Sequence, residues 1–334
     1  MTLRPLGPVA IMGAGSVGCF IGGRLQAAGA SVRFVGRPRV LQAMRQHGLT
    51  LSDIDAPNAA LPAASLHLQE APDSTARLVL LCVKSGATAD AARQLAAALP
   101  PGTPVVSMQN GVSNAEVAAA AAPGLTWLAG MVPFNVAEIG PGQFHRGTGG
   151  VLAAQDHPAL RPWLPVFAAA GLPLALHADL APVQWGKLLL NLNNPVNALS
   201  GLPLRAELLD RDCRIVFAAL QDEALAALRA AGIQPAQLLA LPPQRLPALM
   251  RLPNFAFRIV AARMLRIDPQ ARSSMADDLA LGRPTEVDAI CGAVVRLAQA
   301  HGGRSALNER MLSLLGAPQP RAVGGKALRA ALGL

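Results

Sequence analysis

The chain of 334 residues contains no tyrosine, and aromatic residues make up only 3% of it. Proteins that bind single-stranded nucleic acid stack the bases on aromatic side chains, so this composition argues against that function. The net charge is +9, but the basic residues are scattered and form no long run. We therefore expect no nucleic-acid partner, and a small anion such as a phosphorylated cofactor or a carboxylate substrate would suit the charge as well.

Cysteine is scarce too. The four residues of this type lie far apart in mostly apolar segments: Cys19, Cys82, Cys213 and Cys291. Zinc sites and secreted disulfide frameworks need closer or denser spacing. We expect no metal site and no disulfides, and a reducing cytoplasm as the compartment.

Long apolar runs of the kind that target or span membranes are missing. The start "MTLRPLGPVAIMGAG" has no apolar run that ends in a small-residue cleavage site. One long uncharged stretch, between Glu116 and Glu138, contains two prolines and two glycines, which would leave backbone groups unpaired in lipid. We expect a protein without a signal peptide or a membrane segment.

A glycine motif follows the first predicted strand. Residues 9–12 form a short apolar run, and Gly13, Gly15 and Gly18 then have the spacing G-x-G-x-x-G. A helical segment and a second strand, "SVRFVG", complete a β-α-β unit, the context in which this motif binds a dinucleotide. The glycines let the backbone approach a pyrophosphate at the start of the helix. A tight turn without a ligand is the alternative.

Arg37 stands at the end of the second strand, 19 positions after Gly18. An NAD-binding protein places an acidic residue there for the ribose hydroxyl, whereas arginine suits a 2′-phosphate. The pattern favours NADP over NAD, and a solvated surface arginine is the alternative. Lys84 and Asn110 follow two further buried strands, on the side where open parallel sheets bind ligands, although ordinary loop residues also occur there.

The remaining pattern predicts the domains. Beyond Gly124, short apolar runs between turns indicate antiparallel strands that extend the sheet. After Asp179 helical periodicity dominates, around residues 183–200, 206–231, 287–301 and 305–315. We expect an α/β protein with an N-terminal Rossmann-type, doubly wound sheet domain, residues 1–178, followed by an all-α C-terminal domain, residues 179–334.

One predicted helix contains residues that disfavour helices. At positions 187–197 the chain has "KLLLNLNNPVN", in which asparagine is a weak helix former and proline a breaker. Pro195 lacks an N–H and crowds the carbonyl of residue 191, so we expect a bend that could turn Asn191, Asn194 or Asn197 toward a cleft. A partly frayed helix with solvated asparagines is the alternative.

Two further helix starts carry polar residues. Ser274 can cap a helix with Asp277 three positions later, and Thr285 can cap the next with Asp288, which leaves Glu286 in the first turn. These polar residues either cap the two helices or bind a carboxylate group at a helix N-terminus. Their spacing is compatible with both roles.

The motifs occur together in one known family. The order "GAGSVG", "VKSGAT", "QNGV", "GKLLLNLNNPVNALSG" and "SSMADDLALGRPTEVDAICG" resembles the ketopantoate reductases (2-dehydropantoate 2-reductases) over nearly the whole chain. These enzymes reduce 2-dehydropantoate to (R)-pantoate with NADPH on the way to vitamin B5. The resemblance implies a catalytic proton donor, Lys187, and Glu286 near the cofactor ribose and the active site. It implies substrate contacts at Asn110, Asn191, Asn194 and Ser274, and cofactor contacts at Gly13, Gly15, Ser16, Val17, Gly18, Arg37, Lys84, Asn110 and Glu286.

The chain departs from the family pattern near the lysine. The family asparagine eight positions after the lysine is Pro195 here, so Asn194 or Asn197 replaces that contact. A paralogous reductase of another branched 2-oxo acid is therefore an alternative, and a non-catalytic NADP-binding sensor is a third. A small 2-oxo acid is the expected partner. The sequence leaves open whether the protein is a homodimer, since the terminal "GGKALRAALGL" could dock on its own chain or on a neighbour.

Overall fold

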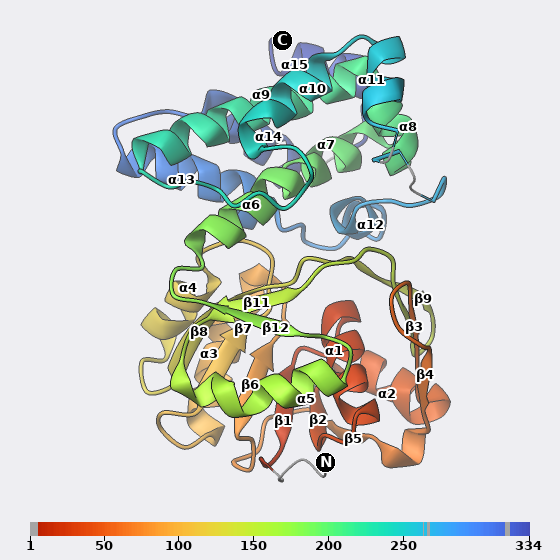
Figure 1. Ribbon diagram of the computed structural model, residues 1–334, viewed down its shortest axis with the longest axis vertical. Coiled ribbons are helices and arrows are strands. Elements are labelled where there is room, and N and C mark those ends of the chain that lie inside the picture. The colour runs from red at the N-terminus through yellow and green to blue at the C-terminus, as the bar shows by residue number, and fades with distance from the viewer. Residues whose placement is uncertain (1–5, 263, 266–267, 318–320) are drawn as a thin grey trace. The chain divides into compact units, whose positions relative to one another are not determined.

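The computed structural model describes residues 6–262, 264–265, 268–317 and 321–334. The chain divides into two compact units, residues 1–180 and 181–334 (Figure 1). The first unit is built on a sheet and the second consists of helices, as the sequence predicts.

The main sheet of the first unit has eight strands in the order β12-β11-β8-β7-β6-β1-β2-β5. All neighbours from β8 to β5 are parallel, which confirms the Rossmann-type core. The strands are β1 (Val9–Met12), β2 (Val32–Val35), β5 (His67–Gln69), β6 (Leu78–Leu81), β7 (Pro104–Ser107), β8 (Thr126–Met131), β11 (Leu152–Gln155) and β12 (Leu174–His177).

The strands after Gly124 differ from the expectation. β11 is antiparallel to β8, as predicted, but β8 is parallel to β7 because a helix crosses over between them. Two other strands leave this sheet and join residues about 90 positions earlier in a second sheet of order β4-β3-β10-β9. Its strands are β3 (Leu49–Asp53), β4 (Ala59–Leu61), β9 (Val136–Gly140) and β10 (Gln143–Arg146).

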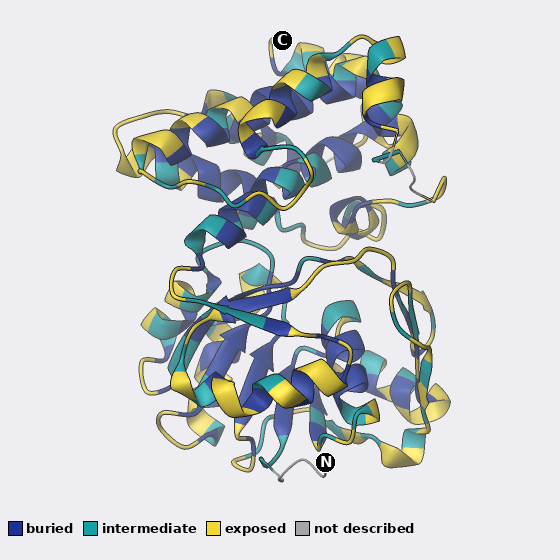
Figure 2. Cartoon of the chain, in the orientation of Figure 1, coloured by how far each residue is buried: buried dark blue, intermediate teal, exposed yellow. Residues whose placement is uncertain are grey.

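Helix α1 (Ser16–Ala27) packs directly on the parallel strands. A Cβ at Gly22 would lie 2.6 Å from the Phe34 ring, so the absence of a side chain sets this close approach. The central strands β1 and β6 and the inner face of the helix are buried (Figure 2). Phe20, Phe34 and Ile11 have no exposed surface. The other helices of this unit are α2 (Pro38–His47), α3 (Thr88–Ala98), α4 (Asn114–Ala121) and α5 (Leu164–Ala169).

Helices make up the second unit, and its described residues contain no strand. The long helix α9 (Arg211–Ala230) contacts most of the others (Figure 1). No helix in the described residues is long and apolar enough to cross a membrane. The other helices are α6 (Ala181–Asn191), α7 (Asn193–Ser200), α8 (Leu204–Leu209), α10 (Leu246–Arg251), α11 (Asn254–Val260), α12 (Ser274–Ala280), α13 (Ala293–Ala300), α14 (Ala306–Gly316) and α15 (Gly325–Ala331).

Two predicted helices are each divided in the structure. The segment 183–200 forms α6 and α7, and the segment 206–231 forms α8 and α9. Asp210 separates the second pair, since its carboxylate accepts hydrogen bonds from the backbone N–H groups of Asp212 (2.8 Å) and Cys213 (3.2 Å) and so caps α9.

The C-terminal segment docks on its own chain. Helix α15 packs against α9 and α7, and Leu328 is fully buried there. Arg329 forms an ion pair with Asp212 at 2.8 Å. Of the two alternatives that the sequence left open for "GGKALRAALGL", the structure shows docking on its own chain.

Candidate nucleotide site and catalytic lysine

The glycine turn between β1 and α1 has a fixed backbone. Gly13 has φ +108°, and a Cβ there would lie 2.6 Å from the backbone nitrogen of Val83. The N–H groups of Gly13 and Ala14 both donate to the carbonyl of Val35, at 2.9 and 3.0 Å. The turn is thus held between the ends of β2 and β6, and only glycine is compatible with its first position.

The start of α1 is open on one side. A Cβ at Gly15 would meet no atom within 4 Å, whereas a Cβ at Gly18 would lie 2.2 Å from the carbonyl oxygen of Gly13. No side chain caps this helix, and no acidic residue lies in its first turn. The early backbone N–H groups, including those of Ser16 and Val17, therefore lack helical acceptors and suit an anion such as a pyrophosphate.

Arg37 lies beside this turn in the fold. A Cβ at Gly36 would lie 2.7 Å from the Cβ of Ala14, so the end of β2 contacts the glycine turn. Arg37, the next residue, precedes α2, and both Arg37 and Arg39 are exposed. The guanidinium groups of Arg37 and Arg39 therefore belong to residues one and three positions after Gly36, which touches the glycine turn. Such cations suit a phosphate group.

Lys84 and Asn110 follow β6 and β7, and their two loops are connected by hydrogen bonds. The Ser85 hydroxyl donates to the carbonyl of Asn110 at 3.0 Å, and the side-chain amide of Gln109 donates to the carbonyl of Val83 at 3.0 Å. Lys84 is exposed and Asn110 is half-buried. Because Val83 also contacts Gly13, the structure brings the ends of β1, β6 and β7 together, and with them the predicted cofactor residues.

Lys187 and Asn191 share one face of α6, one turn apart. Burial lowers the pKa of Lys187 from its ordinary value to about 8. Such a lysine is still protonated near neutral pH but gives up its proton more readily than an exposed lysine. Asn191, the last residue of the helix, is buried.

The helix is interrupted where the sequence predicts a bend. Helix α6 ends at Asn191, four residues before Pro195, and α7 begins at Asn193. Pro195 has no N–H to donate to the carbonyl of residue 191. Leu192 keeps a helical backbone, and its N–H still donates to Leu188 at 3.0 Å. The break is therefore confined to one residue, and the asparagines on its two sides lie on separate helices.

Asn197 and Asn194 differ in their surroundings. Asn197 is fully buried, its amide nitrogen donates to the carbonyl of Leu202 (2.9 Å), and its side-chain oxygen accepts from the backbone N–H of Ser273 (2.9 Å). Asn194 is half-buried. Asn197 thus serves the packing of the helices, which leaves Asn194 as the candidate for the substrate contact.

The predicted cap at Ser274 is wrong by one residue. The hydroxyl of Ser273 accepts from the N–H of Ala276 (3.1 Å) and caps α12, while Ser274 is the first helical residue and is exposed. Only Ser274 has an acidic residue three positions later, but Ser273 is the serine that is buried next to Asn197, and it forms the cap. The Ser274 hydroxyl is consequently not used as the cap.

The predicted cap at Thr285 is also wrong. The helix begins at Val287 and opens with a π-helical segment, Asp288–Gly292. The Asp288 carboxylate accepts a hydrogen bond from Arg296 at 2.8 Å. Glu286 is half-buried directly before this helix. π-Helical segments often occur at functional sites, which agrees with a role for this stretch. Among the described residues, no cluster of acidic, histidine or cysteine side chains could hold a metal ion.

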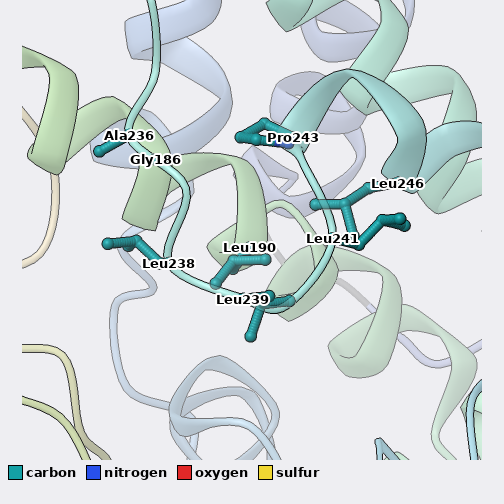
Figure 3. A pocket seen from close by; sticks show the side chains of 8 residues that line it. All are labelled: Gly186, Leu190, Ala236, Leu238, Leu239, Leu241, Pro243 and Leu246. Carbon is teal, nitrogen blue, oxygen red and sulfur yellow. The ribbon is translucent and has the colours of Figure 1, made fainter.

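A loop packs against α6 at the residues next to Lys187. A Cβ at Gly186 would lie 2.5 Å from the carbonyl oxygen of Ala236, and the Ala236 N–H donates to the carbonyl of Pro182 at 2.8 Å. Figure 3 shows the small apolar pocket between helix and loop. It is lined by Gly186, Leu190, Ala236, Leu238, Leu239, Leu241, Pro243 and Leu246. The sequence patterns did not single out this loop, which fixes the helix that carries Lys187.

Comparisons with known proteins agree on one family. A sequence model described as "Ketopantoate reductase PanE/ApbA" matches residues 9–158, and the model of the C-terminal part of the same family matches residues 179–319. A 2-dehydropantoate 2-reductase of Halobacterium salinarum is 28% identical over 300 residues, which are 88% of this chain and 92% of the relative. The corresponding protein of Archaeoglobus fulgidus is 27% identical over 316 residues, 92% of this chain and 96% of the relative.

Solved structures show the same architecture. A PanE/ApbA family ketopantoate reductase from Ralstonia eutropha JMP134 has a TM-score of 0.77 and 28% identity, and the match covers 98% of this chain and 100% of that chain. A D-mandelate dehydrogenase with NADH and anilino(oxo)acetate has a TM-score of 0.75 with 18% identity, covering 98% and 100%. The second likeness concerns the fold alone.

Proposed function

The chain belongs to the ketopantoate reductase family, and we propose that it reduces 2-dehydropantoate to (R)-pantoate with NADPH, a step of pantothenate biosynthesis. The family membership itself supports a nicotinamide-dependent oxidoreductase that acts on a CH–OH group of a small keto acid. The observation that carries the finer proposal is the half-buried Lys187 with a lowered pKa, one helical turn before Asn191.

Lys187 has the properties of a proton donor. Reduction of a 2-oxo acid leaves negative charge on the carbonyl oxygen, and an ammonium group at hydrogen-bond distance polarises that oxygen and then protonates it. A pKa of about 8 suits donation near neutral pH, because the group is protonated and still a moderately strong acid. Asn191 adds an amide donor on the same helical face.

The first unit offers a site for the cofactor, which supplies the hydride when bound. The open side of Gly15 and the uncapped start of α1 suit the pyrophosphate. Arg37, with Arg39 beside it, is proposed to bind a 2′-phosphate, and this is the support for NADPH over NADH. Lys84 and Asn110 are proposed to complete the cofactor site from the neighbouring strand ends.

Three side chains are proposed as substrate contacts besides Asn191. Asn194 is the substitute for the family asparagine, because Asn197 is buried and occupied. The exposed Ser274 is proposed to bind the substrate, and Asn110 to lie near it. Glu286 is proposed to lie close to the cofactor ribose and the reacting carbonyl.

A second candidate substrate follows from the same segment. Pro195 occupies the family asparagine position and Asn197 does not replace it, so the hydroxyl of 2-dehydropantoate has no partner in this segment unless Asn194 reaches it. A branched 2-oxo acid without that hydroxyl, such as 2-oxoisovalerate, would lose nothing. The chemistry at Lys187 is the same for both.

A substrate comparison distinguishes the two. We would measure kcat/KM of the purified protein with NADPH for 2-dehydropantoate and for 2-oxoisovalerate under identical conditions. A higher value for 2-dehydropantoate, above roughly 10⁴ M⁻¹s⁻¹, would support the proposed substrate. A preference for 2-oxoisovalerate would replace it with the second candidate, and tight NADPH binding without turnover of either acid would indicate the sensor alternative.

A further inference from the structure

Glu207, on α8, is a fully buried carboxyl group that the proposed mechanism does not use. Its Oε2 accepts a hydrogen bond from the amide nitrogen of Asn193 at 2.9 Å and another from that of Asn197 at 3.3 Å. The two asparagines lie four positions apart on α7, so they present one face to the carboxyl group.

Two acceptors in this cluster have no donor. The Oε1 of Glu207 and the Oδ1 of Asn193 are both buried, and neither has a hydrogen-bond partner among the described residues. An ionised carboxylate only accepts hydrogen bonds, so it would leave both oxygens unsatisfied at a substantial cost. A protonated carboxyl supplies the missing donor, because an Oε1–H group can donate to Oδ1 while Oε2 accepts from the same amide.

The charges around Glu207 agree with a protonated group. Asp210, at the end of α8, is the charged neighbour that acts on it, and the nearby thiol of Cys213 on α9 is neutral because burial raises its pKa. Helix α7 presents neutral amides. Burial, and to a smaller degree Asp210, raise the pKa of Glu207 to about 8, although the two amide donors act in the opposite direction.

The cluster reaches the helix that carries Ser274. Asn197 donates to Glu207 through its amide nitrogen and accepts the backbone N–H of Ser273 at its side-chain oxygen. Ser273 in turn caps α12 through its hydroxyl. The orientation of Asn197 thus fixes the first turn of α12, where Ser274 is exposed.

We propose that Glu207 is a neutral carboxylic acid in the folded protein near pH 7, that it forms a double hydrogen bond with Asn193, and that it positions Asn197 and the first turn of α12. Glu207 is a positioning residue, since it touches neither substrate nor cofactor. Its effect on catalysis rests on the proposed function, whereas its protonation does not.

Infrared spectroscopy tests the protonation directly. In protein labelled with ¹³C at the glutamate carboxyls, we expect the carbonyl stretch of a protonated carboxylic acid at pH 7, which disappears in Glu207→Gln. An ionised carboxylate absorbs at a different frequency and does not contribute to this band, and the loss of the band in Glu207→Gln assigns it to this residue. A wild-type spectrum with carboxylate bands alone would overturn the proposal.

The substitution Glu207→Gln has a matched control at Glu223. Glutamine keeps one donor and one acceptor, as a neutral Glu207 does, so this variant should be at least as stable as the wild type at pH 7. At Glu223 both oxygens accept N–H donors, from Leu307 (2.9 Å) and Asn308 (3.0 Å), so Glu223→Gln should lower the melting temperature. Equal destabilisation by both substitutions would overturn the proposal.

The pH dependence adds a further criterion. Because the pKa of Glu207 is higher in the folded than in the unfolded chain, its contribution to stability is complete below the unfolded value near 4.5 and is lost as the pH rises toward about 8. The melting temperature of Glu207→Gln relative to the wild type should therefore increase between pH 5 and pH 8. A constant difference would contradict a raised pKa.

Activity tests the positioning role. Glu207→Leu should raise KM for the 2-oxo acid roughly tenfold through displacement of α12, while KM for NADPH changes little, and Glu207→Gln should restore the wild-type value. An unchanged KM in Glu207→Leu would reject the positioning role. The spectrum and Glu207→Gln decide the protonation even if Glu207→Leu does not fold. A wild type that shows the acid band but reduces no 2-oxo acid would contradict the proposed function alone.

Discussion

The side-chain oxygen of Asn197 accepts a hydrogen bond from the backbone N–H of Ser273 at 2.9 Å, across 76 positions of the sequence. This bond joins α7 to the start of α12, the two helices that carry the proposed substrate contacts Asn194 and Ser274. It also explains one asparagine of the unusual helix, because only a residue that both donates and accepts can satisfy Leu202, Glu207 and Ser273 together.

Asn197 and Asn194 are predicted to respond differently to replacement by alanine. Asn197→Ala removes the side-chain partner of the Leu202 carbonyl and of the Ser273 N–H and one of the two donors to Glu207, and it should lower the free energy of unfolding by about 2–4 kcal/mol. Asn194→Ala should cost little stability and should raise KM for the 2-oxo acid. Denaturant unfolding and steady-state kinetics of both variants provide the check, and the reverse pattern would contradict the assignment.

The pH dependence of kcat is predicted from Lys187. Since the ammonium form donates the proton and burial lowers its pKa to about 8, kcat should be constant below that pH and should fall above it. A pH profile at saturating NADPH and 2-oxo acid measures this. A constant kcat up to pH 10 would show that the proton comes from another group.

Arg37 is predicted to select the cofactor. Arg37→Ala should raise KM for NADPH by about tenfold and leave KM for NADH nearly unchanged, because only NADPH carries the 2′-phosphate. Arg45→Ala, at an exposed arginine in the last turn of α2, is the matched control and should alter neither constant. If the two substitutions change the ratio equally, the effect is one of net charge and Arg37 has no specific role.

Substitutions of Gly13 and Gly15 are predicted to have different effects, one on stability and one on NADPH binding. Gly13→Ala should lower the melting temperature, because the backbone has φ +108° and the new Cβ would approach Val83 at 2.6 Å. Gly15→Ala should leave the melting temperature nearly unchanged and weaken NADPH binding, since its methyl group would project into the open space at the start of α1. Calorimetry and a fluorescence titration with NADPH separate these effects. Normal NADPH affinity in Gly15→Ala would argue against a pyrophosphate at this turn.

Local patterns predicted the elements that depend on local physics. The β-α-β unit, the helical second half and the bend before Pro195 all follow from periodicity, glycine spacing and the missing N–H of proline. The second sheet does not, because β10 pairs with β3 across about 90 positions and no local signal specifies that partner. The same reason explains the cap at Ser273 and the role of Asn197, which depend on a contact between distant segments.

The family resemblance named residues whose roles geometry alone would not assign, such as Ser274 and Glu286. The structure adds that Ser274 is exposed and is not the helix cap, which removes the structural explanation for its hydroxyl. Their contacts with substrate and cofactor stay predictions.

The most direct test of the central claim is the rate of NADPH oxidation with saturating 2-dehydropantoate, measured side by side for the wild type and Lys187→Ala. The wild type should turn over, and Lys187→Ala should have kcat lower by roughly 10²- to 10⁴-fold with an unchanged melting temperature, as expected for the loss of a general acid. A loss of only a few-fold would show that Lys187 is not the proton donor, and no turnover by the wild type would contradict the proposed reaction.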